Sequence, residues 1–313
     1  MKCRKLVICI LAALLCASPV YAAEALIPGG QIIGMELETE ALLVAAFEEK
    51  SPARDAGVRI GDYMERINGE RVQTSSDVEG LLQAGGDPVL LELRREGKTL
   101  QIQVDTGGTK RLGLYLKKGI SGVGTVTFYD PADMTFGALG HGVCDKTGTL
   151  LTLRRGKALD ASVRSVKKGL AGAPGQLMGV INEKTPLGSL EKNTPQGVFG
   201  TMKALPKTLP VPVAESHEVR TGDAMIRCTL EGTAPGEYSV RILKVYPGSG
   251  TRNLLVKVTD PALLETTGGI VQGMSGSPII QDGKLVGAVT HVLVNDPQTG
   301  YGIFIENMLE AAG

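Results

Sequence analysis

Apolar and polar residues alternate with a period of two over several short stretches in the first part of the chain. Each stretch ends near glycine, proline or another turn-forming residue, which is typical of half-buried β-strands. Two stretches with helical spacing interrupt them, at residues 52–56 and 76–83. The pattern predicts a small α/β domain whose strands are residues 31–37, 41–47, 63–67, 89–94 and 100–104.

Short strand patterns dominate from about residue 108 onward, and no long helical pattern appears. Many short strands separated by turns favour a barrel or a sandwich. Residues 169–212 are rich in glycine and proline and give no clear pattern. The length of 313 residues fits two hydrophobic cores, so we expect a mainly β protein with two globular parts. The clearest strands of the second part are residues 123–128, 240–245, 254–258, 279–280, 285–294 and 301–305.

The first 22 residues have the order of an export signal. Three basic residues precede an apolar run over residues 6–16, and small residues follow up to Ala23. The apolar run is shorter than the roughly 20 residues of a transmembrane helix. We interpret residues 1–22 as a signal peptide, with an uncleaved membrane anchor as the alternative, and expect an exported protein in both cases.

Charge and cysteine content exclude several classes of protein. Lys plus Arg and Asp plus Glu each number 33, so there is no electrostatic case for nucleic acid as a partner. Only Cys144 and Cys228 lie beyond the N-terminal segment, which excludes a dense disulfide framework and leaves their pairing open. No group of Cys, His and acidic residues has the spacing of a metal site, and no glycine run has the lysine of a phosphate loop, so no metal or cofactor is expected.

One short segment has the features of a nucleophile turn. A nucleophilic serine needs a tight turn that exposes its hydroxyl and directs backbone NH groups at the developing oxyanion. Glycines on both sides of Ser275 allow such a turn, although ordinary surface turns use the same residue types. The amides of Gly273 and Ser275 are the expected oxyanion hole. The segment is Gly273-Met274-Ser275-Gly276-Ser277-Pro278, and the strands after it resemble the closing hairpin of trypsin-like serine peptidases.

A serine hydroxyl attacks well only when a base takes its proton, and the chain has three histidines. His141 is the favoured base, because small residues surround it and it precedes Ser275, as in chymotrypsin-like folds. His217 lies in a polar segment and is interpreted as a solvated loop residue. His291 lies in the strand after the nucleophile, where it either lines the pocket or packs as an ordinary strand residue.

Spacing alone leaves the acid that orients the base open, since Asp145, Asp160, Asp223 and Asp260 all lie between the histidine and the serine. Asp260 stands directly before a proline, which is also typical of a helix cap. Cys144 offers a rival chemistry, because a Cys/His pair can also perform acyl transfer. Its surroundings lack the turn that presents a nucleophile, and we therefore favour the serine.

Residues 51–62, followed by Ile67-Asn68-Gly69, resemble the core of PDZ domains. In that family a peptide adds to a sheet edge, and glycine-rich loops can direct backbone NH groups at an anion. A small α/β domain that only packs on its neighbour is the alternative. By this resemblance the carboxylate-binding loop is Gly30-Gln31-Ile32-Ile33-Gly34-Met35.

The combination of motifs is similar to the SpoIVB family of sporulation serine peptidases. This resemblance implies a PDZ-like module over residues 23–107 and a chymotrypsin-like double β-barrel peptidase domain over residues 108–313. It implies a catalytic set of His141, Asp260 and Ser275. The likeness rests on Gly137-Ala138-Leu139-Gly140-His141, Thr259-Asp260-Pro261, the run from Thr267 to Pro278, and Val289-Thr290-His291-Val292.

The resemblance also implies a substrate and a place of action. The substrate would be a membrane-associated regulatory protein between forespore and mother cell, whose cleavage releases an intramembrane protease that activates a late sigma factor. The enzyme would also cut its own N-terminal region, with the PDZ-like module recognising the partner or its own chain. A non-catalytic protein that binds peptides through this module, with the β domain as a scaffold, is the alternative function.

Overall fold

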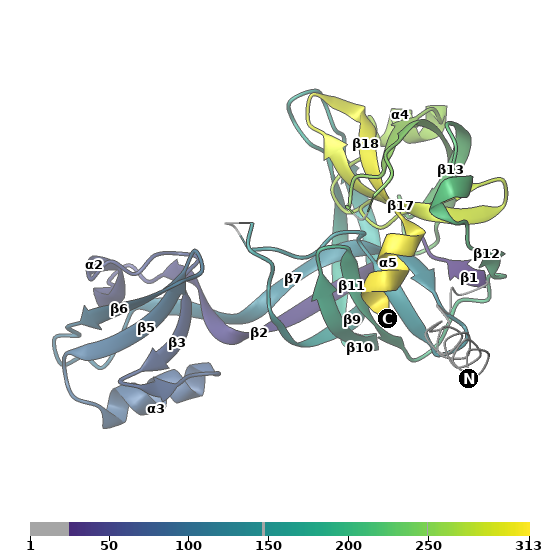
Figure 1. Ribbon diagram of the computed structural model, residues 1–313. Helices are drawn as coiled ribbons and strands as arrows, with labels where there is room; N and C mark the ends of the chain where they lie inside the picture. The colour runs from purple at the N-terminus through teal and green to yellow at the C-terminus, as the bar shows by residue number, and fades with distance from the viewer. Residues whose placement is uncertain (1–24, 146–147, 249) are drawn as a thin grey trace, which may run out of the picture.

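The computed structural model describes residues 25–145, 148–248 and 250–313, so the predicted export segment at residues 1–22 lies outside the described residues. The described chain forms three bodies, a PDZ-like module and two β-barrels (Figure 1). The mainly β fold class is therefore confirmed. Within the described ranges, no helix has the length and apolar content needed to span a bilayer.

The C-terminal barrel is closed and antiparallel. Its strands alternate between buried and exposed side chains, as in β14, where Val240 and Ile242 point into the core. Two short helices accompany it, α4 (Pro261–Thr267) and α5 (Ile305–Ala312). In order round the barrel, the strands are β13 (Gly222–Cys228), β14 (Gly236–Val245), β15 (Leu254–Val258), β18 (Asp296–Phe304), β17 (Lys284–Leu293) and β16 (Pro278–Gln281).

The first barrel is also a ring of paired strands, because β2 pairs with β7 as well as with β9 and so closes part of the larger sheet on itself. Two packed barrels are the double-barrel architecture that the sequence predicts. The ring runs through β2 (Ile32–Phe47), β7 (Leu114–Tyr129), β8 (Thr135–Ala138), β11 (Gly197–Met202), β10 (Gln176–Thr194) and β9 (Leu153–Lys167), and β1 (Ala25–Pro28), β12 (Val211–Pro212) and the 3-10 helix η1 (Ser216–Glu218) lie outside it.

The PDZ-like module is built on the far ends of β2 and β7, which run side by side from the barrel into the module (Figure 1). Val78 and Leu82 of helix α3 bury one face of that helix against the module's sheet. A capping box between Thr74 and Asp77 fixes the start of α3. The remaining elements are α2 (Pro52–Asp55), β3 (Tyr63–Ile67), β4 (Glu70–Arg71), α3 (Ser75–Ala84), β5 (Val89–Arg95) and β6 (Lys98–Val104).

The strand pairing divides the chain differently from the predicted module over residues 23–107 and peptidase domain over residues 108–313. Residues 32–38 pair with β9 and with the second half of β7, so they belong to the first barrel. Residues 114–117 of β7 pair with the end of β2 inside the module. The module is thus an insertion between two barrel strands. The two strands predicted at residues 31–37 and 41–47 are one strand with an irregularity between Glu38 and Leu43.

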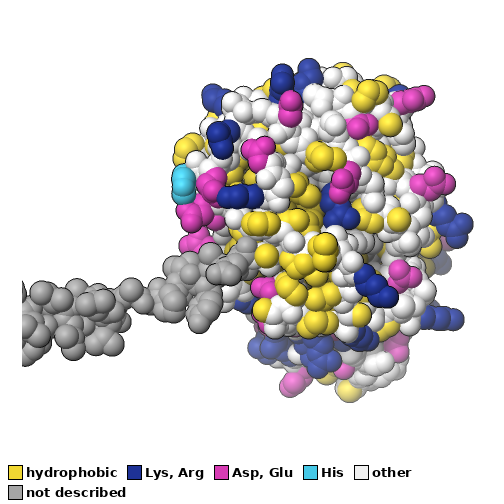
Figure 2. All heavy atoms as spheres, turned by 90° about the vertical axis from the view of Figure 1, so that its right-hand side faces the viewer, with side chains coloured by type: hydrophobic (Ala, Val, Ile, Leu, Met, Phe, Trp, Pro, Cys, Tyr) yellow, Lys and Arg dark blue, Asp and Glu magenta, His cyan; other side chains and the backbone are white. Residues whose placement is uncertain are grey.

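Figure 2 shows the face of the molecule on the side of β12 and β13. Apolar side chains gather near its middle, and Lys, Arg, Asp and Glu side chains are interspersed around them. Leu209, just before β12, is 83% exposed. This face therefore carries charges of both signs around an apolar centre.

Candidate active site

Ser275 lies in a tight turn between α4 and β16, and the first barrel holds this turn in place. Gly273 and Gly276 have φ angles of +98° and +95°, which side chains rarely allow. A Cβ atom on Gly276 would come within 2.0 Å of the carbonyl oxygen of Thr125 in β7. Thr125 donates its hydroxyl hydrogen to the Gly273 carbonyl at 2.7 Å, and Thr127 donates in the same way to the Gly276 carbonyl at 2.8 Å. The candidate nucleophile therefore sits at the contact between the two barrels.

The backbone amides of this turn differ in whether they donate a hydrogen bond within the protein. Gly276 donates its amide hydrogen to the carbonyl of Val289 at 2.7 Å. The amides of Gly273 and Ser275, by contrast, are not donors in any backbone hydrogen bond between described residues outside the regular elements. Both are thus available for an oxyanion, as the predicted oxyanion hole requires.

A cavity of about 510 Å³ opens above this turn, and both barrels line it. The predicted nucleophile and base share this cavity although 134 positions separate them in the sequence. The polar and thiol side chains of its wall are Ser275, His141, His291, Cys144 and Gln272.

His141 follows β8 through a turn in which Leu139 and Gly140 both have positive φ angles. Its Nδ1 atom is 2.9 Å from the carbonyl oxygen of Gly142. Because a carbonyl can only accept, Nδ1 carries the hydrogen, and Nε2 is left with the lone pair that a base needs. Burial lowers the pKa of His141 below 6.5, and the Gly142 carbonyl partly offsets this effect. The side chain is therefore a neutral imidazole at neutral pH.

The hydroxyl of Ser275 donates to the carbonyl oxygen of Thr290 in β17 at 2.7 Å. No hydrogen bond joins it to His141 in the described part of the chain. The serine side chain must therefore turn from β17 toward the imidazole before the proton can be transferred.

Asp260 lies elsewhere, at the start of α4. Its carboxylate accepts from the amide of Leu263 at 3.0 Å and from the amide of Ser239 at 3.2 Å. Among the described residues, no contact joins Asp260 to His141, and Asp260 does not line the cavity. The geometry thus matches the helix-cap interpretation, and it does not bring together the three residues that the resemblance implies.

The structure contradicts the predicted carboxylate-binding loop at Gly30-Gln31-Ile32-Ile33-Gly34-Met35. These residues lie at the start of β2 in the first barrel, where Ile33 and Met35 are buried. A Cβ atom on Gly34 would lie 2.5 Å from the Ile181 side chain, and the carbonyl of Gly30 accepts from the Thr229 hydroxyl at 3.0 Å. The glycines allow close packing between strands, and the prediction is wrong.

A different loop has the features that the prediction sought. Gly113 has a φ angle of +68°, and a Cβ atom there would lie 2.5 Å from the carbonyl oxygen of Lys50. The loop enters β7 beside α3, and a cavity of about 150 Å³ lies between these elements. The sequence signal is an apolar-Gly-apolar triplet just before a strand, placed after the PDZ core instead of before it. The lining includes Val78, Leu82, Lys110, Arg111, Leu112, Gly113, Leu114 and Leu116.

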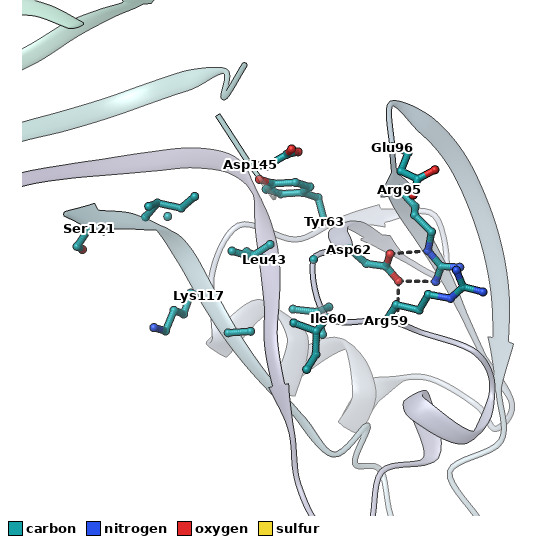
Figure 3. Close-up of a pocket in the computed structure, with 15 residues that line it drawn as sticks. Leu43, Arg59, Ile60, Asp62, Tyr63, Arg95, Glu96, Lys117, Ser121 and Asp145 are labelled. Carbon is teal, nitrogen blue, oxygen red and sulfur yellow. Dashed lines mark hydrogen bonds and ion pairs between the residues drawn. The ribbon is translucent and has the colours of Figure 1, made fainter. Parts of the chain in front are cut away.

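A further cavity of about 450 Å³ lies beside β2 and β7, against the module (Figure 3). Ile120 of β7 lines both this cavity and the candidate active-site cavity, so the two adjoin. An ion pair of 2.6 Å between Arg95 and Asp62 forms part of its wall. The other labelled lining residues are Leu43, Arg59, Ile60, Tyr63, Glu96, Lys117, Ser121 and Asp145.

Comparison with known proteins gave matches in two of three searches. The family model described as SpoIVB peptidase S55 matches residues 108–309, and a PDZ domain model matches residues 43–95. No curated protein gave a significant match.

Similar solved structures include two of the Rv3671c protease. Its inactive form has 16% sequence identity and a TM-score of 0.37, with 61% of this chain and 84% of that chain covered. Its active form, from M. tuberculosis, has 15% identity and a TM-score of 0.39, with 62% and 75% covered. Likeness at this level carries no argument, whereas the first family model spans more than half of the chain. The protein therefore belongs to the SpoIVB peptidase S55 family and is a serine peptidase with a PDZ domain, acting on a protein or peptide substrate.

Proposed function

We propose that this chain is an exported sporulation endopeptidase that uses Ser275 as nucleophile and His141 as base. The observation that carries the proposal is the single cavity between the barrels, which holds both side chains beside two unused backbone amides. A neutral imidazole with its lone pair on Nε2 suits the base, and a glycine-flanked turn suits the nucleophile.

The proposed reaction proceeds through an acyl-enzyme. Nε2 of His141 takes the proton of Ser275 as Oγ attacks the peptide carbonyl carbon. The amides of Gly273 and Ser275 hold the resulting oxyanion, a contribution of about 2.7–4 kcal/mol for each donor. His141 then gives its proton to the leaving amine, and the same base activates the water that releases the acyl group. Throughout, the carbonyl of Gly142 fixes the tautomer of the imidazole.

The PDZ-like module is proposed to recruit the substrate through the groove between α3 and β7. An extended peptide can add to the β7 edge there, with apolar side chains against Val78 and Leu82. Two bases, Lys110 and Arg111, and two acids, Glu48 and Glu79, border the same groove, and Arg111 pairs with Glu48 at 3.3 Å. The N-terminal region of the chain itself is a second candidate ligand, since the family resemblance includes self-cleavage.

The proposed substrate is a membrane-associated regulatory protein in the space between forespore and mother cell, whose cleavage triggers activation of a late sigma factor. Membership of the SpoIVB family supports this proposal. The export pattern of residues 1–22 supports the location, either as a cleaved signal or as an anchor.

The test compares the purified protein with its Ser275→Ala variant. Both are incubated with the extracytoplasmic part of such a regulator and with a short peptide that spans the cleaved bond. We expect cleavage by the unchanged protein and a loss of about 10⁴-fold or more in the variant, because the nucleophile is removed. Equal cleavage by both proteins would contradict the proposed nucleophile, and cleavage of the peptide but not the regulator would contradict the proposed substrate.

A further inference from the structure

A second histidine lies against the proposed base, and no Asp or Glu of the described residues lines the cavity that they share. The ring centroids of His141 and His291 are 5.1 Å apart, and the ring planes are tilted by 40°. Both rings line the cavity that holds Ser275. His291 also follows Thr290 directly, and the Thr290 carbonyl accepts the hydroxyl hydrogen of Ser275. Strand β17 therefore touches the nucleophile and the base through two neighbouring residues.

The Nδ1 atom of His291 is buried and has no hydrogen-bond partner in the described part of the chain. Such an atom is rare in folded proteins and calls for an explanation. Burial, together with the smaller effects of the nearby His141 and Arg252, lowers the pKa of His291 to about 4. His291 is therefore a neutral imidazole under the conditions in which His141 works as a base.

We propose that His291 is a positioning residue for His141, an inference that rests on the proposed roles of His141 and Ser275. Its ring packs against the imidazole of His141 and limits how far that ring can turn. With its neutral ring centred 5.1 Å from that of His141, His291 also provides a polar neighbour for the charge that His141 acquires. The proton of Ser275 moves to His141 and then to the leaving amine, while His291 neither gains nor loses a proton.

The charged and titratable groups around this pair come from both barrels. Tyr301 pairs with His291 across β17 and β18, and Arg252 lies over the Tyr301 ring at 5.2 Å. On the other side, Cys144 lines the cavity on the loop after His141, and burial together with the following Asp145 raises the pKa of its thiol. Asp260 caps α4 and has no described contact with His141.

The test uses His291→Phe, which keeps an aromatic ring but removes both nitrogen atoms. We expect kcat/KM for a short peptide to fall about 10- to 100-fold, because the base is less well held. We also expect the acid limb of the kcat/KM profile to move to lower pH by about half a unit to one unit, because the imidazolium loses a polar neighbour. A purely structural role would lower activity without moving that limb.

His291→Asn is the matched control, since its amide can place a polar atom near the position of Nδ1. In this variant we expect the acid limb of the kcat/KM profile to lie at its wild-type pH and most of the wild-type activity to be retained. Wild-type activity and an unmoved limb in His291→Phe, together with an inactive Ser275→Ala variant, would overturn this inference and leave the proposed function intact. Full activity in Ser275→Ala or His141→Ala would instead overturn the proposed function itself.

If His291→Phe does not fold, imidazole NMR of the Ser275→Ala protein decides the question, because the chain has only three histidines to assign. We expect the His291 ring to remain neutral down to about pH 5 and its signals to shift when His141 titrates. A His291 that titrates near its ordinary pKa, with no response to His141, would overturn the inference.

Discussion

Two segments of this chain contain closely spaced glycines but differ in their role in the fold. In the segment Gly273 to Gly276, glycines with positive φ leave two amides unused beside a cavity. In the segment Gly30 to Met35, Gly34 allows a neighbouring side chain to pack against the backbone inside a barrel. The comparison teaches that glycine permits either an exposed anion site or close packing. The surrounding fold decides which of the two it serves.

After removal of the nucleophile itself, the largest effect is expected for Gly276→Ala. The new Cβ atom would lie 2.0 Å from the Thr125 carbonyl oxygen at a φ of +95°, so the turn must shift and its amides must move. We expect at least about 100-fold lower kcat/KM, in line with the loss of one oxyanion donor. Peptide hydrolysis and the unfolding temperature measure it, and a variant with unchanged kcat/KM would show that this turn does not build the site.

Gly34→Ala makes the matching change in the other segment. Its Cβ atom would lie 2.5 Å from Ile181, and overpacking of this kind typically lowers the free energy of unfolding by about 1–3 kcal/mol. Denaturant unfolding measures this loss. The folded fraction should keep its kcat/KM and its affinity for peptides. Weaker peptide binding with unchanged stability would restore the original prediction of a binding loop at this segment.

A third glycine, Gly113, borders the groove of the PDZ-like module, where we expect it to support peptide binding. Gly113→Ala would bring a Cβ atom within 2.5 Å of the Lys50 carbonyl oxygen and displace the loop. We expect about tenfold weaker binding of a peptide with a free C-terminus, a loss of roughly 1.4 kcal/mol. Fluorescence anisotropy measures the affinity, and cleavage of a short peptide serves as the control, since it should not change.

Asp260→Ala distinguishes a helix cap from a catalytic acid. Loss of the bonds from the Leu263 and Ser239 amides should lower the free energy of unfolding by about 1 kcal/mol. Thermal unfolding measures this effect. The kcat/KM of the folded enzyme and its pH profile should stay close to those of the unchanged protein. A drop of several hundredfold with unchanged stability would show that the carboxylate supports the imidazole.

The smallest expected effect is a shift in pH dependence. Activity requires neutral His141, and burial lowers the pKa of this residue below 6.5. The acid limb of kcat/KM should therefore have its midpoint below pH 6.5, because the lowered pKa keeps the base unprotonated at a lower pH. A profile of kcat/KM between about pH 4.5 and 8 measures it. A midpoint above 6.5 would indicate a base stabilised in its charged form, as a nearby carboxylate would make it.

Much of the fold could be predicted because strand alternation and turn residues are local signals. The nucleophile turn was equally accessible, since its glycines flank Ser275 directly. Strand β10 lies wholly within the glycine- and proline-rich residues 169–212, whose sequence shows no clear pattern, and β9 is not among the strands that the sequence pattern predicts. Alternation also does not reveal which strand pairs with which. For this reason the first half of β2 was assigned to the PDZ-like module instead of the barrel.

The surroundings of His141 include residues distant from it in the sequence, so less of this part of the candidate site could be predicted. Small neighbours and chain order pointed to His141, but the role of Gly142 as acceptor could not be read from the sequence. The sequence left His291 as either a pocket or a packing residue, and only the structure places its ring beside His141. Asp260 had two interpretations, and its hydrogen bonds match the cap.

The most direct test of the account is covalent labelling with a fluorophosphonate probe, followed by intact-mass and peptide mass spectrometry. We expect one adduct, located on Ser275, that disappears in Ser275→Ala and forms at least about 100-fold more slowly in His141→Ala, where the general base is missing. A Cys144→Ala variant should label at the unchanged rate. An adduct at another residue, or equal labelling rates with and without His141, would contradict the central claim that these two residues form one catalytic pair.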